Sequence, residues 1–391
     1  MVMVKDKSYR LLIVHPGFSK HIRRFIRRLK QYNKDVKIDI LVTCSPDTEV
    51  PNDISENVDN VKYIKLLRPE KCANKEIRLL YNIVSIKRQI RCIAQQEHYD
   101  VINIHFPNLY IALGARYYKK MCNKLLLTPW GSDVYQLNSI ERHYIAKLYE
   151  EADNVTGLGN RFTRDYQKMF GVPDEKIVRL TIASETADFI KSHKGSITQE
   201  EAKEKIGIKG YYGIVCSYNG NPIGNHIKMF DAIKKIKDEI PVPIMILVQI
   251  TYGYTVEYLN KLKNYINNNN LNAIFFDKYL SQEDLYCLMM SADMFIFVPD
   301  SDSNSGVLKE YISLGKKVIL GEWLRYDDLL ECNGLPYFPT KSFDTLSDTI
   351  KEAYFSDHRP VDPEWLNNFE NGGYDYWMPK WNDYYMSCCK K

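Results

Sequence analysis

The sequence predicts an α/β protein of two doubly wound, Rossmann-like domains. Apolar runs of strand length alternate with helical patterns along most of the chain, which is typical of parallel sheets. At 391 residues the chain also exceeds the length that a single hydrophobic core usually supports. Apolar periodicity lapses over the polar segment 184–198 and then resumes. We therefore expect domains over 1–190 and 191–360, with an aromatic-rich C-terminal tail over 361–391.

Composition and cysteine usage narrow the class of protein. The chain is 45% hydrophobic and 26% charged, and its net charge of +4 is too mild to indicate a nucleic-acid partner. Its nine cysteines are odd in number and lack C-x-x-C spacing, which argues against a disulfide framework and a zinc site. No apolar run approaches the roughly 18–20 residues of a spanning helix, so we expect a cytoplasmic protein without an export signal or membrane anchor.

The first domain is expected to open with a buried strand over 9–14. The loop after it contains Gly17, and a helix over 20–32 follows, as in the first strand-to-helix turn of a Rossmann-like fold. The remaining strands of this domain are expected at 36–43, 61–66, 101–106, 125–128, 154–158 and 178–182, and its helices at 75–96, 141–151 and 160–170.

The helix over 20–32 combines an apolar stripe with a strongly basic remainder. The stripe is expected to pack on the sheet, and the four arginines on the other side of the helix are Arg23, Arg24, Arg27 and Arg28. Two interpretations stay open. The arginines form the solvated side of a core helix, or they attract the protein to an anionic membrane surface at about 1 kcal/mol per charge.

Two sets of polar residues follow strands of the first domain. His105 lies near the end of the strand over 101–106, and the sequence Trp130-Gly131-Ser132-Asp133 follows a later strand. Ligands of parallel sheets bind beyond such strand ends, so His105 and Asp133 are candidate catalytic residues, with Gly17, Trp130 and Gly131 as candidate substrate contacts in the loops beside them. The alternatives are a core imidazole for His105 and a helix N-cap for Asp133.

The second domain is expected to begin with a helix near 198 and a strand over 212–217. Asn219, Gly220, Asn225 and His226 then lead into a helix over 227–237, and glycine and asparagine at a helix start favour phosphate binding. Further strands are expected at 243–250, 273–277, 294–298 and 317–321, and further helices at 256–266, 285–291, 307–314 and 345–354.

The strand over 294–298 stops at Pro299 and is followed by a polar loop and a helix. The loop contains Asp302 and ends at Ser305 and Gly306, and Glu310 lies one turn into the helix. Two carboxylates eight positions apart can face one crevice and accept hydrogen bonds from sugar hydroxyls. The alternatives are a turn former for Asp302 and a solvated helix residue for Glu310.

The spacing of Asp302 and Glu310 resembles the E-x7-E motif of the retaining GT-B glycosyltransferases, such as glycosyltransferase family 4. In that family the first acid holds the donor sugar and the second holds the nucleotide ribose. The W-G-S-D sequence looks like that of GT-B polysaccharide transferases, and N-G-N-P-x-x-N-H resembles a turn of the lipid-linked fucosamine transferases. The chain departs from family 4 in having one glycine in its first loop and, after the strand over 212–217, no cation before Lys228.

The resemblance implies two Rossmann-like domains facing a central cleft, with the C-terminal tail crossing back to the first domain. It also implies transfer of a sugar from a nucleotide-sugar donor to a hydroxyl of a glycan acceptor. A lipid-linked acceptor, in cell-surface polysaccharide synthesis at the inner membrane face, fits the basic helix best. No metal or other cofactor is expected. The alternatives are a nucleotide-sugar epimerase of the same architecture and a non-catalytic partner subunit.

Overall fold

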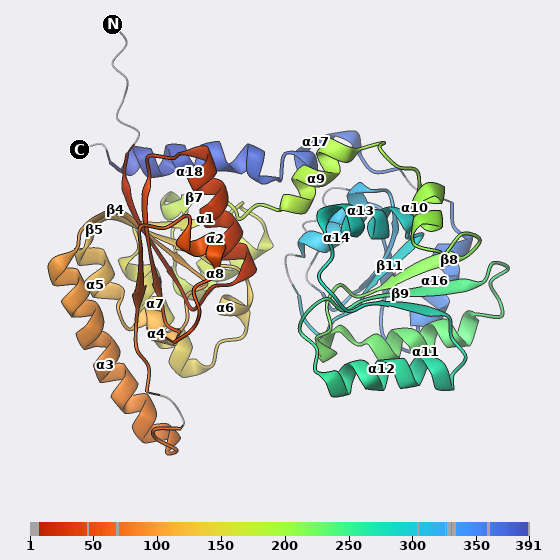
Figure 1. Cartoon of the computed structure of the whole chain (residues 1–391), viewed down its shortest axis with the longest axis horizontal. Helices are drawn as coiled ribbons and strands as arrows, with labels where there is room; N and C mark the ends of the chain where they lie inside the picture. Colours follow the sequence, from red (N-terminus) through yellow and green to blue (C-terminus); the bar gives the residue numbers. More distant parts are fainter. Residues whose placement is uncertain are drawn as a thin grey trace, which may run out of the picture. The chain divides into compact units, whose positions relative to one another are not determined.

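The computed structural model describes residues 8–44, 47–67, 70–302, 305–324, 326, 330, 334–357 and 360–389. The chain forms two compact units, one made of Met1–Ala183 with Tyr374–Lys391 and the other of Ser184–Gly373. Each unit has one parallel β-sheet with helices on both of its faces (Figure 1). The predicted fold class is therefore confirmed.

The first unit is built on a seven-stranded sheet of order β3-β2-β1-β4-β5-β6-β7. Its strands are β1 (Arg10–His15), β2 (Lys37–Val42), β3 (Asn60–Tyr63), β4 (Tyr99–His105), β5 (Cys122–Thr128), β6 (Asn154–Thr156) and β7 (Ile177–Val178). Its helices are α1 (Lys20–Tyr32), α2 (Asn52–Ser55), α3 (Lys75–Gln96), α4 (Leu109–Ala112), α5 (Ala115–Lys120), α6 (Ser132–Tyr135), α7 (Ser139–Glu151), α8 (Arg161–Phe170) and α18 (Tyr374–Cys388).

The second unit is built on a six-stranded sheet of order β10-β9-β8-β11-β12-β13. Its strands are β8 (Tyr212–Cys216), β9 (Ile244–Gln249), β10 (Ala273–Phe276), β11 (Met294–Phe297), β12 (Lys317–Gly321) and β13 (Phe338–Thr340). Its helices are α9 (Glu185–His193), α10 (Gln199–Lys205), α11 (His226–Ile236), α12 (Val256–Asn268), α13 (Gln282–Ser291), α14 (Gly306–Ser313), α16 (Leu346–Phe355) and α17 (Pro363–Glu370).

The central strands are buried on both faces because helices cover both sides of each sheet. In β1, Leu12 and Val14 belong to one core cluster, whereas Leu11 and Ile13 belong to the cluster on the opposite face. This alternation follows from the two-residue period of a strand. It also explains why these strands read as continuous apolar runs in the sequence.

The segment 184–198 differs from the linker that was expected. Ser184 caps α9 by accepting hydrogen bonds from the amides of Thr186 and Ala187, and α9 packs on α13 and α17 of the second unit. The units consequently meet in sequence at Ala183–Ser184 rather than at 190, and the second unit continues to Gly373 rather than to 360.

The last helix, α18, belongs to the first unit. It packs on α1 and β4 and contributes four buried side chains to the core of that unit: Tyr374, Met378, Trp381 and Tyr385. The Trp381 indole N–H donates to the Thr181 carbonyl oxygen (2.9 Å), and the Asn103 amide donates to the Tyr385 hydroxyl (2.8 Å). The aromatic residues of the tail thus complete the core around β1 and β4.

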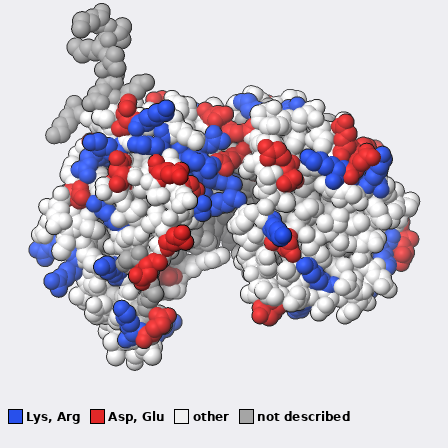
Figure 2. Space-filling view, viewed as in Figure 1, with Lys and Arg blue, Asp and Glu red and all other residues white. Residues whose placement is uncertain are grey.

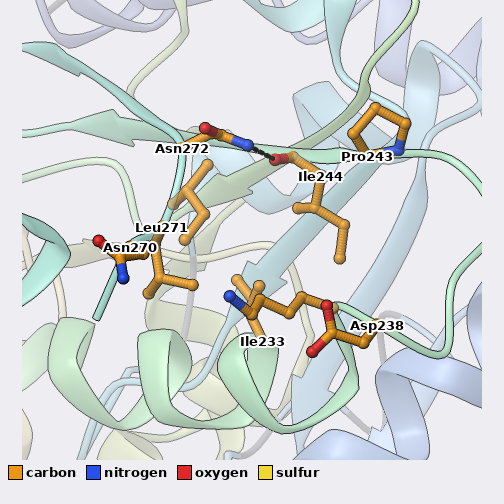
Figure 3. A pocket seen from close by; sticks show the side chains of 9 residues that line it. Ile233, Asp238, Pro243, Ile244, Asn270, Leu271 and Asn272 are labelled. Carbon is orange, nitrogen blue, oxygen red and sulfur yellow. Dashed lines mark hydrogen bonds between the residues drawn. The ribbon is translucent and has the colours of Figure 1, made fainter.

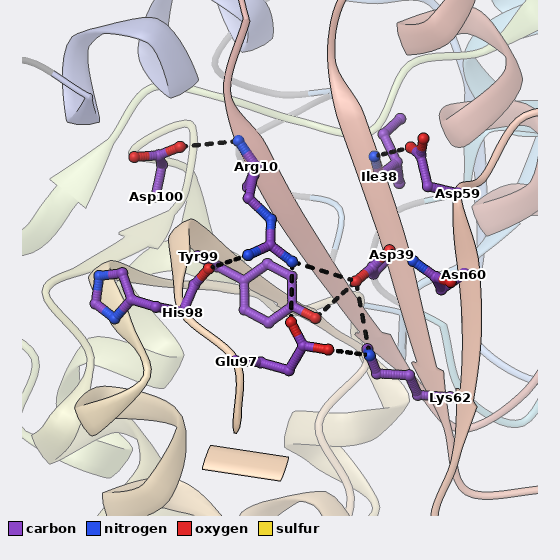
Figure 4. A network of polar contacts seen from close by, with 10 residues as sticks. All are labelled: Arg10, Ile38, Asp39, Asp59, Asn60, Lys62, Glu97, His98, Tyr99 and Asp100. Carbon is purple, nitrogen blue, oxygen red and sulfur yellow. Dashed lines mark hydrogen bonds and ion pairs between the residues drawn. The ribbon is translucent and has the colours of Figure 1, made fainter. Parts of the chain in front are cut away.

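A charged network holds together the amino-terminal side of the first sheet (Figure 4). Glu97, which follows α3, accepts hydrogen bonds from Arg10 on β1 (2.9 Å) and from Lys62 on β3 (2.7 Å). Asp39 on β2 is buried and accepts a hydrogen bond from the Tyr99 hydroxyl (2.7 Å). The network lies opposite the strand ends at which ligands of parallel sheets bind, so we interpret it as structural.

Candidate functional site

In the second unit, Asn225 fixes the turn between β8 and α11. Its φ of 59° lies in the left-handed region, which asparagine tolerates better than most residues. Its side-chain amide lies within hydrogen-bond distance of the carbonyl oxygens of Ile223 and Val298 (both 3.0 Å) and donates to Asp300 (2.8 Å). Since Val298 and Asp300 follow β11, one side chain ties together the loops after two adjacent strands.

Gly220 lets the same turn approach the loop after β9. Its amide donates to the Tyr252 carbonyl oxygen (2.7 Å), and a Cβ at this position would lie 2.5 Å from the Cβ of Tyr254. Asn219, beside it, accepts a hydrogen bond from the Asn221 amide (2.9 Å). The predicted donor-binding residues Asn219 and Gly220 thus lie where the loops after β8 and β9 meet.

His226, the first residue of α11, is fully buried. Its Nδ1 lies 3.1 Å from the Tyr258 hydroxyl, and its Nε2 has no hydrogen-bond partner among the described residues. Burial lowers its pKa from 6.5 to about 4, so the ring is neutral at pH 7. His226 can therefore offer a hydrogen bond to a phosphate but not a positive charge.

The loop after β11 leads into α14 through Ser305 and Gly306. The Ser305 hydroxyl caps the helix by accepting a hydrogen bond from the Leu308 amide (3.3 Å), and the Ser305 amide donates to the Tyr326 hydroxyl (2.6 Å). Asp302 is half-buried and close enough for its charge to raise the pKa of Tyr326, which burial raises most. The predicted acid of this loop thus faces other polar residues of the strand edge.

Glu310 is only 5% exposed, so it is not the solvated helix residue of the alternative interpretation. The Ser184 hydroxyl donates to its Oε1 at 2.9 Å. Because that hydroxyl is anchored at the start of α9, the carboxylate of Glu310 is held in a defined position. Sequence reasoning missed Ser184; the acidic residues Glu185 and Asp188 directly after it were the signal for a capped helix.

Lys309 on α14 is a candidate cation near these acids that the sequence analysis did not identify. Burial lowers the pKa of Lys309, and the nearby charges of Asp302 and Glu310 partly offset this shift. Lys228, the cation considered from the sequence, instead places its ammonium 3.9 Å from the centre of the Phe343 ring. α14 therefore brings a lysine close to both acids, and the sequence pattern of the β8 loop gave no sign of it.

Two exposed tyrosines extend this edge of the second sheet. Tyr252 follows β9 and Tyr279 follows β10, and their rings are parallel within 7° with centroids 6.1 Å apart. The pKa of Tyr252 is raised to about 12, mostly by burial and further by the charges of Asp302 and Glu310. The Asn219 side chain hydrogen-bonds to Tyr252 and opposes this shift. The tyrosine pair therefore lies beside the predicted donor-binding residues Asn219, Asp302 and Glu310.

In the first unit, His105 lies at the end of β4 and is completely buried. Its ring is 5.0 Å from that of Phe25, 6.1 Å from that of Trp130 and 6.2 Å from that of Trp381. Burial holds its pKa well below the usual range, and neither ring nitrogen has a hydrogen-bond partner among the described residues. His105 is thus a neutral imidazole whose hydrogen-bonding capacity the protein leaves unused.

Asp133 acts within its own loop. It is 3% exposed, and its carboxylate accepts hydrogen bonds from the amides of Trp130 (2.9 Å) and Gly131 (2.6 Å). Gly131 has a φ of 135°, which an L-residue rarely adopts. Burial raises the pKa of Asp133 to about 7, although these hydrogen bonds oppose the shift. Asp133 is not the N-cap of the alternative interpretation, because it lies within α6, whose N-cap is Gly131; its carboxylate instead holds the backbone of Trp130 and Gly131.

Trp130 covers this edge of the first sheet together with histidine and phenylalanine side chains. Its ring lies 5.4 Å from that of His15, which ends β1, and its indole N–H is buried with no partner among the described residues. His15 contacts the backbone of Gly17, and a Cβ at Gly17 would meet no atom within 4 Å. The structure thus groups Trp130, His105 and the Gly17 loop at the carboxyl ends of β1, β4 and β5.

The four arginines of α1 are half-buried, and two of them have identified partners. The Arg23 guanidinium donates to both carboxylate oxygens of Asp53 (2.8 and 2.9 Å). Arg28 lies 3.9 Å from Asp375 and over the ring of Tyr374. Figure 2 shows a group of blue side chains on this part of the first unit, with red ones beside it. These contacts favour the core-helix interpretation of α1.

A depression in the second unit lies away from the predicted donor-binding residues. It is lined by Pro243 and Ile244 at the start of β9 and by Asn270, Leu271 and Asn272 before β10 (Figure 3). These are the amino ends of the strands, whereas the loops after β8, β9 and β11 follow their carboxyl ends. Its position does not match that of ligands in doubly wound sheets.

The described residues contain no cluster of three or more His, Cys, Asp or Glu side chains that could hold a metal ion. None of their helices is long and apolar enough to cross a membrane.

Comparison with known proteins identifies the fold. Residues 10–157 match the family model described as glycosyl transferase 4-like. The chain matches none of the curated proteins with which it was compared. Among solved structures, it is similar to a glycosyltransferase from Rickettsia africae, with a TM-score of 0.69 and 15% identity over 98% of this chain and 99% of that one.

Two further structures show the same two-domain likeness. A sucrose-phosphate synthase from Thermosynechococcus elongatus has a TM-score of 0.66 and 10% identity, over 97% of this chain and 98% of that one. Anabaena HepE, solved in complex with UDP and glucose, has a TM-score of 0.60 and 11% identity over 97% of each chain. The chain therefore has the two Rossmann-like domains of the GT-B fold, and its residues 10–157 match the glycosyl transferase 4-like family.

Proposed function

We propose that the protein is a glycosyltransferase that moves a sugar from a nucleotide-sugar donor to a hydroxyl of a glycan acceptor. The observation that carries this proposal is Glu310, a buried carboxylate at the carboxyl edge of the second sheet, held there by Ser184. An ordinary helix surface residue would be exposed. A carboxylate in this position can instead accept hydrogen bonds from the two hydroxyls of a ribose.

The surrounding residues fit the other parts of a nucleotide sugar. We assign Asp302 to the donor sugar, and the turn of Asn219, Gly220, Asn225 and His226 to the diphosphate. Lys309 supplies a positive charge beside both acids, where the departing nucleoside diphosphate gains negative charge. Helix N-termini and this lysine can stabilise that charge, so we expect activity without a metal ion. Because HepE binds UDP and glucose, UDP-glucose is the first donor to test.

The first unit would bind the acceptor. In the transfer, the bond between the sugar C1 and the diphosphate oxygen breaks and its electron pair stays on that oxygen. A new bond forms between C1 and the acceptor oxygen, and the proton of the acceptor hydroxyl passes to the departing diphosphate. His105 and the Trp130 indole N–H have unused hydrogen-bonding capacity at this edge and are our candidates for acceptor contact. Asp133 is proposed to position Trp130 rather than to take the proton. A lipid-linked glycan remains the proposed acceptor class.

A nucleotide-sugar panel tests the proposal. Thermal unfolding is measured with UDP-, GDP- and TDP-sugars, and product formation is measured for every donor that raises Tm, in the presence of EDTA. A ligand at 100 times its Kd stabilises the folded state by about 2.7 kcal/mol, which a Tm measurement detects. Release of nucleoside diphosphate together with a glycosidic product supports the proposal. Epimerisation of the free donor would instead show that the protein is an epimerase.

One observation favours a non-catalytic partner subunit as the second candidate. The β8–α11 turn contains no Lys or Arg between Cys216 and Lys228, and Lys228 contacts Phe343. If no donor of the panel raises the Tm and none is turned over, the protein is the non-catalytic partner subunit. Binding of a nucleoside diphosphate that Lys309→Gln abolishes would instead show that α14 supplies the missing cation.

A further inference from the structure

The exposed face of α3 carries an unusual combination of side chains. Its first half presents Ile77, Leu80, Tyr81 and Val84, which are between 56% and 69% exposed and follow the i, i+3, i+4, i+7 spacing of one helical stripe. Four of the twelve large hydrophobic side chains that are exposed in the described part of the protein are therefore neighbours on one helix. Scattered exposed hydrophobic residues are ordinary, whereas such a group marks an interaction surface.

The second half of the same face is basic. Lys87, Arg88 and Arg91 are exposed on the same side of α3 as the apolar stripe, and none of them takes part in an ion pair among the described residues. Near the start of α3, Lys71 and Lys75 are also exposed, but the exposed Glu70 and Glu76 offset their charge. With a rise of 1.5 Å per residue, the apolar and basic groups follow each other along roughly 20 Å of helix.

The packing of α3 explains why the apolar stripe is exposed. The buried residues of α3 are Asn82, Ile86 and Ile90, which lie on the opposite side of the helix and begin only after its second turn. The first turns extend along the edge of the first unit (Figure 1), and the end of the unit at which α3 begins is mostly white in Figure 2. Core packing therefore does not account for the stripe.

We propose that this face of α3, which we call the α3 surface (Ile77, Leu80, Tyr81, Val84, Lys87, Arg88 and Arg91), binds an anionic lipid bilayer. Apolar side chains enter the boundary between headgroups and acyl chains, and the neighbouring cations contact phosphate groups. The charge pattern decides between occupants, because a second copy of the same α3 surface would bring like charges together. This inference extends the proposed function and does not depend on it.

The α3 surface also replaces α1 as the membrane-binding element. The arginines of α1 are half-buried, and Arg23 and Arg28 have acidic partners within the unit. Lys87, Arg88 and Arg91 have none among the described residues. The apolar stripe of α1, in contrast to that of α3, is entirely buried in the core.

Co-sedimentation with vesicles tests the proposal. The neutral vesicles contain phosphatidylcholine alone, and the anionic vesicles contain phosphatidylcholine with about 30% phosphatidylglycerol. A basic triple variant (Lys87→Gln, Arg88→Gln, Arg91→Gln) should weaken binding to the anionic vesicles roughly a hundredfold, at about fivefold per charge. An apolar variant (Leu80→Ser, Val84→Ser) should weaken it by about tenfold or more. Both variants change exposed side chains and should unfold at the Tm of the wild type.

Matched controls separate the α3 surface from general effects of charge and hydrophobicity. Lys168→Gln, Lys235→Gln and Lys261→Gln remove three exposed charges elsewhere, and Val256→Ser removes a valine that is 66% exposed, close to the 69% of Val84. Wild-type binding by these controls supports the proposal. Equal binding by the basic variant and the wild type, or equal binding to neutral and anionic vesicles, would overturn it. Self-association in sedimentation velocity that the apolar variant abolishes would assign the surface to a second copy of the chain instead.

Discussion

At the scale of single residues, burial determines how the candidate side chains act. His105 and His226 are fully buried, and burial lowers the pKa of each, so both rings are neutral at pH 7. They can exchange hydrogen bonds with a substrate but do not neutralise a phosphate. Lys309 is close enough to Asp302 and Glu310 for both charges to raise its pKa, which burial lowers more, and it is our candidate for this role. In the proposed donor site, the balance of charge would therefore depend on α14.

Replacing Glu310 by Gln tests the donor site most directly. The change keeps the size of the side chain and its contact with Ser184 but removes the charge from a hydrogen bond to the ribose. Such a bond contributes roughly 1.5–3 kcal/mol, so kcat/KM should fall about 10- to 150-fold. Steady-state kinetics with the donor found in the nucleotide-sugar panel measure the effect.

Glu352→Gln is the control for this substitution, because Glu352 is exposed on α16 of the same unit. It removes the same charge at a distance from the strand edge and should keep wild-type kinetics. If Glu310→Gln also keeps the wild-type KM for the donor and the wild-type kcat, Glu310 does not bind the ribose.

The substitution Asp133→Asn separates a positioning role from proton transfer. The pKa of Asp133 is raised from 3.8 to about 7 in the folded protein, so between these values the unfolded chain has released a proton that the folded chain retains. Stability of the wild type is therefore lost as pH rises through this window. The stability of Asp133→Asn relative to wild type should rise by roughly 2–4 kcal/mol from pH 4 to pH 7 and then level off.

Chemical unfolding at several pH values measures that difference. In the activity assay, Asn keeps an oxygen that can accept from the Trp130 amide, so we expect kcat/KM within a few-fold of wild type. Asp133→Ala lacks this oxygen and should lose more activity. A hundredfold loss in Asp133→Asn with an unchanged Tm would return Asp133 to the role of catalytic base.

Sequence patterns located the candidate residues of both strand edges but not their surroundings. Glu310 could be placed because E-x7-E spacing is local to one loop and one helix. Its partner Ser184 is 126 residues away, and no local pattern brings the two together. Similarly, the sequence allowed His105 to be a core residue or a ligand, and only its neighbours Phe25, Trp130 and Trp381 show how deeply it is buried.

At the scale of elements, the charged network of Figure 4 connects three parts of the first unit. Glu97, the residue after α3, joins Arg10 at the start of β1 to Lys62 on β3. Hydrogen bonds from Lys62 and then Arg10 lower the pKa of Glu97 below its usual 4.5. The network thus stabilises the folded state above that pH, and its contribution is lost as pH falls through the lowered pKa of the folded state.

Glu97→Gln should therefore lower the Tm of the first unit at pH 7 and make little difference near pH 3. Because Glu97 is partly exposed, the loss should be modest, about 1 kcal/mol. Thermal unfolding of both proteins from pH 3 to pH 8 tests this. A Tm difference that is independent of pH would show that Glu97 acts through packing instead.

Most elements were predictable because buried parallel strands and capped helices have strong local signals. The helix α9 was missed because its apolar residues are few, and it is stabilised by contacts with α13 and α17 that are distant in sequence. Strand β13, Phe338–Thr340, was missed because three residues that include a proline give no strand pattern, and it pairs only at the edge of the sheet beside β12.

At the scale of the whole molecule, the first unit is discontinuous in sequence. Deleting residues 374–391 should prevent it from folding. The deletion removes four buried side chains, and truncation of a single large core residue typically costs 3–5 kcal/mol, against a total stability of about 5–15 kcal/mol. We expect the truncated protein to lose protease resistance over residues 8–183 and to keep it over 184–373.

Limited proteolysis with mass spectrometry measures this pattern. Removal of the N-terminal residues 1–7, which precede the first strand, is the control and should leave both units resistant. A truncated protein whose first unit stays resistant would show that α18 is dispensable for the core around β1 and β4.

The pairing of Ser184 with Gly373 places the two ends of the second unit side by side. During synthesis, the ribosome releases residues 184–373 before α18, so the second unit can fold while the first still lacks Trp381 and Tyr385. All strands of the first sheet precede residue 184, but part of its apolar surface stays uncovered until α18 emerges. The nascent protein is therefore most in need of a chaperone after residues 184–373 have been made and before α18 has emerged.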